Sequence, residues 1–163
     1  MIRAVIFDLD GTLIQLPIDY DQLLEKIAAI AGTSNLHPLN QKVSALDQKK
    51  RKQVFKIWDK AELLALEKAI AREPGMALYK KYSLKPKALI TMQGKTLTET
   101  IMEKLGLSFD FAVTREESLD RISQLRIAAE RLGTPFEHVL FVGNTDEDCS
   151  AAEEVHCQFH RVI

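Results

Sequence analysis

The sequence has 163 residues, the length of one globular domain with room for a small insert. Hydrophobic residues make up 46% of it and charged residues 28%, an ordinary balance that argues against disorder. With 22 Lys and Arg against 23 Asp and Glu, the net charge of -1 gives no reason to expect nucleic acid as a partner.

Targeting and redox signals are equally sparse. No apolar run approaches the roughly 20 residues of a membrane-spanning helix, so no membrane contact is expected. The first residues lack the layout of a signal peptide, and we expect a cytoplasmic domain. Cys149 and Cys157 have no CxxC spacing and are expected to be ordinary thiols.

The first predicted element is a strand over residues 3–9, a nearly continuous apolar run that is too short for a helix. Such runs are typical of strands that are buried on both faces of a parallel sheet.

Residues 15–74 show helical spacing and no strand-like run. Leu23, Leu24 and Ile27 share the apolar face of a first helix, which we expect to end near Gly32. Helix-favouring residues then continue almost unbroken to residue 73. We therefore expect an all-helical insert of two helices. It carries enough apolar residues to form an interface between copies of the chain, unless its own contact with the core buries them.

The second half of the chain alternates between strand-like and helix-like segments. Strands are predicted over four apolar runs, at 88–91, 111–114, 139–142 and 158–163. One helical stripe runs from Leu97 to Leu105 before Gly106, and another from Leu119 to Leu132 before Gly133. This alternation predicts an α/β fold, a three-layer doubly wound parallel sheet with a Rossmann-like core formed by residues 1–14 and 75–163.

The most informative stretch, residues 7–13, reads Phe-Asp-Leu-Asp-Gly-Thr-Leu. It places Asp8 and Asp10 at the carboxyl end of a buried strand, where ligands bind in open α/β sheets. Two carboxylates are costly to place there without a compensating cation or ligand. Gly11 would let the backbone turn sharply away from the strand.

This string resembles the first motif of the haloacid dehalogenase-like hydrolases, and the resemblance extends along most of the sheet-forming chain. It implies that Asp8 is the nucleophile, which forms an aspartyl-phosphate, and that Asp10 is the general acid and base. An ionised carboxylate can attack phosphorus once cations and hydrogen-bond donors screen the negative charges. The dehalogenases of the family lack an aspartate at the second position, so Asp10 favours phosphoryl chemistry.

The family's second motif ends the next core strand with a Thr or Ser hydroxyl that binds phosphate, which implicates Thr91. Gln93 and Lys95 follow in the same loop and are further candidates for phosphate binding. Backbone amides around Gly94 could add donors.

The third motif of the family is a lysine, often followed by proline, and this sequence has no such pair. Residues 114–127 read TREESLDRISQLRI. Arg121 is the best substitute and Arg115 the runner-up, because arginine supplies the charge and binds phosphate with two nitrogens. A surface arginine on an amphipathic helix is the alternative for either residue.

In the fourth motif the family usually has Gly-Asp-x-x-x-Asp, with the first aspartate on Mg²⁺. Here Asn144 stands in that position, while Asp148 is kept. An amide oxygen can bind Mg²⁺, but the lost charge should weaken the site. The resemblance therefore implies a Mg²⁺ site formed by Asp8, Asp10 through its carbonyl, and Asn144 or Asp148.

Three functions are compatible with these motifs. The first is a Mg²⁺-dependent phosphatase acting on a small phosphorylated molecule, with residues 15–74 as a cap over the site. The second is a non-catalytic relative that binds a phosphorylated ligand or a protein, which the departures at the third and fourth motifs would suit. The third is a phosphomutase or phosphotransferase, which differs from the phosphatase only in the acceptor.

Overall fold

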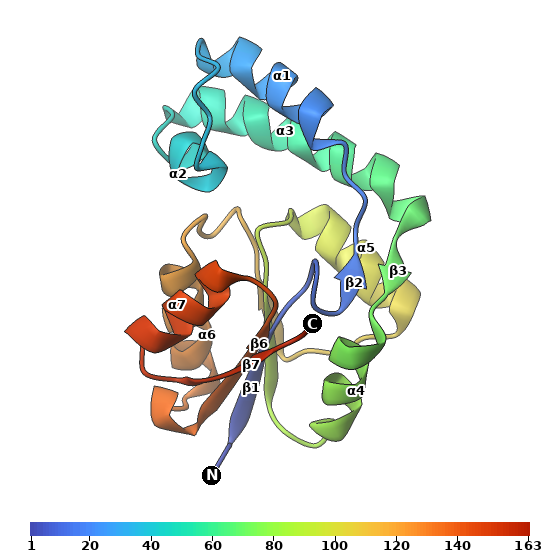
Figure 1. The fold of residues 1–163 in the computed structure, drawn as a ribbon, viewed down its shortest axis with the longest axis vertical. Coiled ribbons are helices and arrows are strands. Elements are labelled where there is room, and N and C mark those ends of the chain that lie inside the picture. Colours follow the sequence, from blue (N-terminus) through green and yellow to red (C-terminus); the bar gives the residue numbers. More distant parts are fainter.

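Strands and helices alternate along the chain in the computed structural model, which describes residues 1–163 (Figure 1). In chain order the elements are β1 (Ala4–Asp8), β2 (Ile14–Gln15), α1 (Tyr20–Ala31), α2 (Leu39–Ser44), α3 (Gln48–Ala65), the 3-10 turn η1 (Leu66–Lys68), β3 (Ile70–Ala71), α4 (Glu73–Lys81), β4 (Lys87–Ile90), α5 (Lys95–Leu105), β5 (Phe111–Val113), α6 (Arg121–Leu132), the 3-10 turn η2 (Phe136–His138), β6 (Val139–Gly143), α7 (Asp146–Glu154) and β7 (Gln158–Arg161). None of the helices combines the length and the apolar character that crossing a membrane requires.

Five strands form one parallel sheet in the order β5-β4-β1-β6-β7. Each of the five strand runs predicted from the sequence overlaps one of these strands, with bounds that differ by one residue at β4 and β6. β1 lies at the centre, and the chain leaves it first toward β4 and later toward β6. The carboxyl ends of these three strands therefore meet where the order of the sheet reverses, the place where open α/β sheets bind ligands.

Helices cover both faces of the sheet, as the predicted three-layer fold requires. Val5 and Phe7 of β1 pack into an apolar cluster with residues of α4 and α5. Ile6, between them in the chain, joins the opposite cluster with residues of α6 and α7. This alternation follows from the two-residue period of a strand, and it confirms that β1 is buried on both faces.

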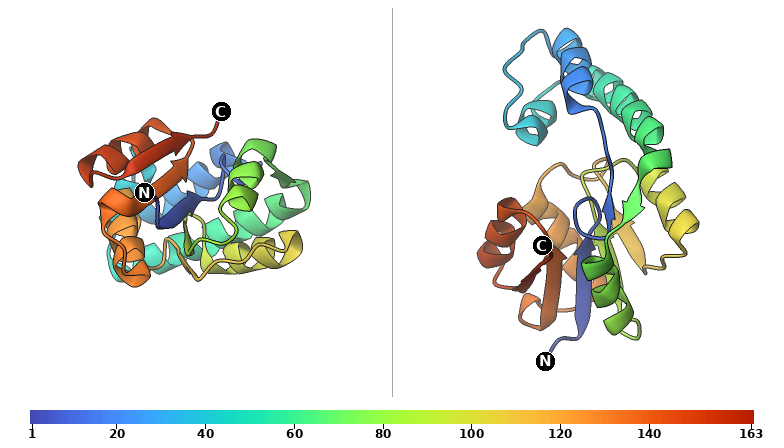
Figure 2. Two further views of the ribbon diagram at one scale, coloured as in Figure 1. Left: turned by 90° about the horizontal axis from the view of Figure 1, so that it is seen from below. Right: turned by 45° about the vertical axis from the view of Figure 1, so that its right-hand side comes forward.

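The insert forms a separate helical layer beyond the carboxyl ends of the strands (Figures 1 and 2). Its helices share an apolar cluster with Leu23 and Ile27 on α1 and Trp58 on α3. Met92 and Leu119 of the sheet-forming part join this cluster. The apolar core of the insert is thus continuous with residues beside the ends of the strands.

The insert differs from the expectation in two details. It contains three helices rather than two, because Asp47 accepts a hydrogen bond from the backbone N–H of Lys50 and starts a new helix there. Its two ends also pair, as β2 and β3 form a short antiparallel ribbon. We propose residues 15–74 as the cap, with this ribbon as its joint to the core.

Leu119 is a further correction. It was expected on the apolar stripe of a helix, but α6 begins only at Arg121, after the capping residue Asp120. Leu119 instead packs against the helices of the insert.

The helix that follows the ribbon is held against the first motif by a glycine. A Cβ atom on Gly75 of α4 would lie 1.9 Å from the backbone oxygen of Thr12. We expect Gly75→Ala to lower the free energy of unfolding by about 1–3 kcal/mol through overpacking, although alanine is the better helix former. Urea denaturation measures this, with Lys80→Ala on the exposed side of α4 as the control. Unchanged stability in Gly75→Ala would show that α4 can retreat from the loop.

Candidate active site

Asp8 ends β1 and is almost completely buried, with 3% of its surface exposed. One carboxylate oxygen lies 3.1 Å from Nη2 of Arg121, and the other accepts a hydrogen bond of 3.1 Å from the hydroxyl of Thr12. Burial raises the pKa of Asp8 to about 7, although Arg121 works in the opposite direction. The carboxylate is therefore poorly hydrated and is held by two protein donors, Arg121 and Thr12.

Arg121 lies between two buried carboxylates. It is the first residue of α6, and its Nε atom lies 2.9 Å from Oδ1 of Asp148 while Nη2 reaches Asp8. The two carboxylates raise its pKa above the ordinary arginine value, against the effect of burial. A single guanidinium thus offsets the charge of Asp8 at the end of β1 and of Asp148 in the first turn of α7.

Thr91 follows β4 directly beside Asp8, because Ile90 and Asp8 are partners in the parallel ladder. Its hydroxyl bonds to the side chain of Gln93, and the backbone N–H of Gln93 donates to the same hydroxyl. We refer to residues 91–95 as the Thr91 loop. Two of the phosphate-binding candidates, Thr91 and Gln93, therefore share one buried hydrogen-bonded turn.

Gln124 connects this loop to the arginine, and the sequence analysis missed it. Its amide accepts a hydrogen bond of 2.9 Å from Nη1 of Arg121 and donates one of 2.8 Å to the backbone oxygen of Thr91. Gln124 is completely buried. Its place one turn after Arg121 on the same helix face is the only sequence signal for this role.

Asn144, after β6, brings its amide against the first motif. One polar atom of this amide lies 3.2 Å from Oδ2 of Asp8 and 3.3 Å from the carbonyl oxygen of Asp10. With nitrogen in this position the amide donates to both oxygens. With oxygen there, it accepts a hydrogen bond of 3.2 Å from the hydroxyl of Thr12 and faces two further oxygen atoms, an arrangement that a cation between them would stabilise.

Asp148 completes the cluster from α7. Its Oδ2 accepts hydrogen bonds of 3.1 Å from the backbone N–H groups of Asn144 and Thr145. Its Oδ1 has no aligned hydrogen bond and faces only the charge of Arg121. Asp148 therefore fixes the turn after β6 with one oxygen and pairs with Arg121 through the other.

Asp10 is half-buried, and its backbone carbonyl oxygen lies 3.3 Å from the amide of Asn144. Burial raises the pKa of Asp10, and the backbone N–H groups of Leu16 and Gly11 act against that shift. The N–H of Leu16 donates to Oδ1 at 2.9 Å, and this bond holds the side chain in place. A carboxyl group with a raised pKa is suited to giving and taking a proton.

Two of the residues considered from the sequence lie apart from this cluster. The side chain of Lys95 is 70% exposed and pairs with Glu99 of its own helix. Arg115, the runner-up for the third motif, instead pairs with Asp59 and Glu62 of α3. The structure therefore brings Arg121, and not Arg115, to Asp8.

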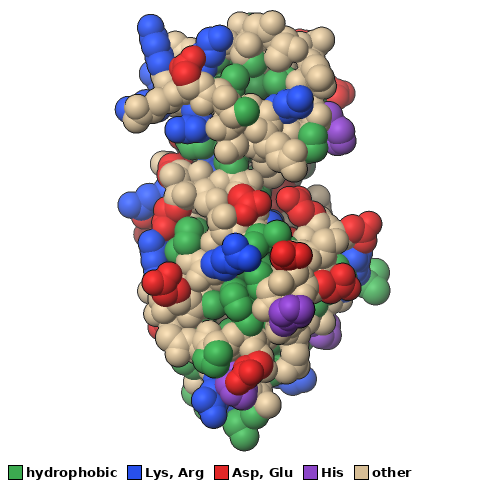
Figure 3. Space-filling model, turned by 90° about the vertical axis from the view of Figure 1, so that its left-hand side faces the viewer, with side chains coloured by type: hydrophobic (Ala, Val, Ile, Leu, Met, Phe, Trp, Pro, Cys, Tyr) green, Lys and Arg blue, Asp and Glu red, His purple; other side chains and the backbone are tan.

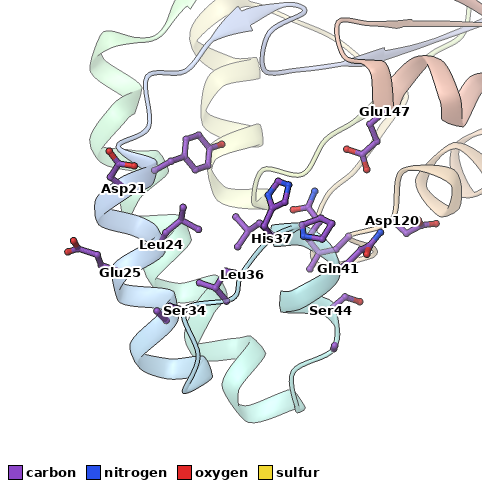
Figure 4. Close-up of a pocket in the computed structure, with 17 residues that line it drawn as sticks. Asp21, Leu24, Glu25, Ser34, Leu36, His37, Gln41, Ser44, Asp120 and Glu147 are labelled. Carbon is purple, nitrogen blue, oxygen red and sulfur yellow. The ribbon is translucent and has the colours of Figure 1, made fainter.

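A cavity of about 1440 Å³ opens between the insert and the core next to this cluster (Figure 4). It is lined by residues of α1 and α2 and, on the core side, by Leu119, Asp120 and Glu147. Figure 3 shows the outer surface here as a waist between the smaller upper part and the core. Asp120 and Glu147 are the chain neighbours of Arg121 and Asp148, so the cavity adjoins the cluster.

The buried charge of Asp8 should be visible in the stability of the metal-free protein. Its pKa is about 7 when folded against 3.8 ordinarily, so the folded state binds the extra proton between these values and stability falls as pH rises through them. Asp8→Asn lacks this proton. With a chelator present, we expect Asp8→Asn to become increasingly more stable than the wild type from about pH 4 to about pH 7, and the gap to stay constant above that. Urea denaturation over this range, with Asp146→Asn as the exposed control, measures it; a gap independent of pH would contradict the raised pKa.

Comparisons with known proteins agree with this architecture. No protein-family model matches the sequence, and no curated protein matches it either. Among solved structures, a putative phosphoglycolate phosphatase from Lactobacillus plantarum superposes with a TM-score of 0.71 at 16% identity, over 97% of this chain and 84% of that one. A haloacid dehalogenase-like hydrolase from Streptococcus pneumoniae gives 0.68 at 17% identity, over 99% and 85%. A putative β-phosphoglucomutase from Thermotoga maritima gives 0.65 at 17% identity, over 99% and 86%.

These similarities extend over nearly the whole chain, including the insert. They agree with the first motif at residues 7–13 and with the order of the sheet, which places that motif at its centre. The chain therefore has the fold of the haloacid dehalogenase-like hydrolases.

Proposed function

We propose that the protein is a phosphatase that hydrolyses a small phosphate monoester through an aspartyl-phosphate on Asp8. The observation that carries this proposal is the position of Asp8, buried at the end of the central strand with Arg121 on one oxygen. A purely structural ion pair between Asp8 and Arg121 would not require a second carboxylate two residues later, yet Asp10 is present and its side chain is held by the N–H of Leu16.

The reaction follows from these positions. An oxygen of ionised Asp8 attacks phosphorus, the bond from phosphorus to the ester oxygen breaks, and Asp10 gives its proton to that oxygen. Water then attacks phosphorus, Asp10 takes the proton of this water, and the bond to Asp8 breaks to release phosphate. Arg121 and the hydroxyl of Thr91 offset and orient the charge on the transferring group.

The oxygen atoms around Asn144 fit a Mg²⁺ ion. Asp8 through Oδ2, Asp10 through its carbonyl and Asn144 through its amide oxygen would hold the ion as hard oxygen donors. The amide atom lies 3.2 Å from Oδ2 of Asp8 and 3.3 Å from the carbonyl oxygen of Asp10. A bound Mg²⁺ would neutralise part of the charge that develops on the phosphoryl group. The amide can also turn its nitrogen inward, so Asn144 suits both the metal-free and the metal-bound protein.

The cavity at the waist is the proposed place for the organic part of the substrate. Two of the structures with which the chain superposes are described as a putative phosphoglycolate phosphatase and a putative β-phosphoglucomutase, names that refer to small phosphorylated molecules. The cap would cover such a molecule and exclude water from the attack.

A second candidate function is the binding of a phosphorylated ligand without turnover. Asn144 favours it, because an amide nitrogen that donates to Asp8 and to the carbonyl of Asp10 replaces the cation that catalysis requires. The two candidates differ in metal dependence, so one titration separates them.

We expect hydrolysis of an aryl phosphate and of a panel of phosphate monoesters that rises with Mg²⁺ and disappears in Asp8→Asn. Asn144→Asp adds a charge to the metal ligands and should lower the Mg²⁺ concentration for half-maximal rate about tenfold. Asp146→Asn, on the exposed side of the same turn, serves as the control. Activity that appears only in Asn144→Asp would favour the binding protein, and product transfer to an added sugar alcohol would favour a phosphotransferase.

Arg121 provides a separate test, because its guanidinium contacts Asp8 and Asp148 with different nitrogen atoms. A lysine has one nitrogen and cannot span both carboxylates. We expect kcat to fall about tenfold in Arg121→Lys and roughly 10²–10³-fold in Arg121→Met, which leaves the phosphoryl charge without its fixed donor. Steady-state kinetics at saturating Mg²⁺ measure this, with Arg126→Met on the outer face of α6 as the control. A fully active Arg121→Met would remove Arg121 from the mechanism.

A further inference from the structure

A second buried charge cluster, outside the proposed site, joins the cap to the core. Arg115, from the loop after β5, places Nη1 2.8 Å from Oε2 of Glu62 on α3, and both side chains are completely buried. Its other terminal nitrogen pairs with Asp59, one turn earlier on the same helix. The guanidinium also lies 4.7 Å from the ring centre of Trp58 and 5.5 Å from that of Phe55.

The same two residues hold the Thr91 loop. Oε1 of Glu62 accepts a hydrogen bond of 3.0 Å from the backbone N–H of Gly94. Nη1 of Arg115 donates to the backbone oxygen of Met92 at 3.2 Å. The backbone N–H of Arg115 donates to the backbone oxygen of Gln93, also at 3.2 Å. A cap residue and a core residue therefore fix the far side of the loop whose near side carries Thr91.

The contacts of α3 with Arg115 and with Gly94 are expected to break together. Moving α3 away from the core would leave Arg115 with neither carboxylate partner and the N–H of Gly94 without an acceptor. A buried charge or donor that loses its partner is strongly destabilising, so separation of the cap and rearrangement of the loop are expected to occur together.

We propose that Glu62 and Arg115 couple docking of the cap to the shape of the Thr91 loop, with Glu62 as a positioning residue for phosphate binding. This proposal rests on the proposed function, since it assigns phosphate to that loop. It also accounts for the amide of Gly94, which the sequence suggested as a phosphate donor and which is instead bonded to the cap.

Gly94 offers a way to disturb this junction while keeping every buried charge. Its φ of -76° suits any residue, but a Cβ atom there would lie 2.3 Å from Oδ1 of Asp59 and 2.7 Å from Nη2 of Arg115. Gly94→Ala should therefore displace the side chains of Asp59 and Arg115 from the loop, while the backbone of residue 94 keeps its conformation.

The chain has one tryptophan, Trp58, and it stacks on Arg115 in this junction, so its fluorescence reports on cap docking. We would measure acrylamide quenching of Trp58 and the dissociation constant of inorganic phosphate by calorimetry with Mg²⁺ present. The variants are Glu62→Ala, Glu62→Gln and Gly94→Ala, with the exposed Glu67→Ala as the matched control.

We expect phosphate to protect Trp58 from acrylamide in the wild type and in Glu67→Ala. Glu62→Ala and Gly94→Ala should increase quenching and weaken phosphate binding about tenfold, while Glu62→Gln, which keeps an acceptor for Gly94, should recover most of that affinity. Should Glu62→Ala fail to fold, Gly94→Ala carries the test. Unchanged phosphate affinity in Gly94→Ala despite greater quenching would overturn the coupling.

Failure of the proposed function looks different from failure of the coupling. A wild type that neither hydrolyses phosphate esters nor binds phosphate would remove the phosphate role. Hydrogen exchange of residues 91–95 without ligand would then decide the coupling. Faster exchange across this loop in Gly94→Ala than in Glu67→Ala supports it, and equal exchange overturns it.

Discussion

The charge on two buried carboxylates is the constraint on which the rest of the core depends. Asp8 ends β1, Asp148 lies in the first turn of α7, and Arg121 is the cation that contacts both. Without it, two negative charges would face each other in a site that excludes water, at a cost of several kcal/mol. The start of α6, the turn after β6 and the end of β1 therefore depend on one another, because displacement of any one of them would separate these charges. Gln124 extends the same constraint to the Thr91 loop, because it bonds to Arg121 and to the backbone of Thr91.

A second arginine, Arg115 in the loop between β5 and α6, forms ion pairs with α3 of the insert. Arg115 and Arg121 are six residues apart, and each lies between two carboxylates: Arg115 faces Asp59 and Glu62, and Arg121 faces Asp8 and Asp148. The loop after β5 therefore contacts the insert through Arg115, and the start of α6 contacts the two carboxylates of the proposed site through Arg121. The Thr91 loop lies between the two clusters and is bonded to a member of each, Gln124 on one side and Glu62 on the other. The insert, the Thr91 loop and Asp8 therefore belong to one connected network of hydrogen bonds and ion pairs.

Asn144 is where this chain departs most from the resemblance in its motifs, and its geometry explains how the departure can be tolerated. An aspartate at this position would face Asp8 and the carbonyl of Asp10 with a full charge and would require a cation at all times. The amide satisfies the same two oxygens by itself through its nitrogen and offers an oxygen to a metal when turned. Identities of 15% to 18% with the solved structures establish the fold and leave the chemistry to these residues. A glycine supports the close approach, since any Cβ on Gly11 would meet the side chain of Asn144 at 2.2 Å.

The fold of the core and the position of the first motif could be predicted from the sequence by itself, because both depend on residues that are close together in the chain. Apolar runs of strand length, helical stripes that end at Gly106 and Gly133, and the string around Asp8 and Asp10 each depend on near neighbours in the chain. Only the tertiary structure decided between Arg115 and Arg121, since both are arginines near one helix start and differ only in what faces them across the fold. The same holds for Glu62 and Gln124: a buried polar side chain is recognised by its partners, and those partners lie 32 and 33 residues away in the chain. Helix breaks set by a single cap, as at Asp47, fall between these cases, because the capping residue is local but its use depends on where α2 and α3 must pack.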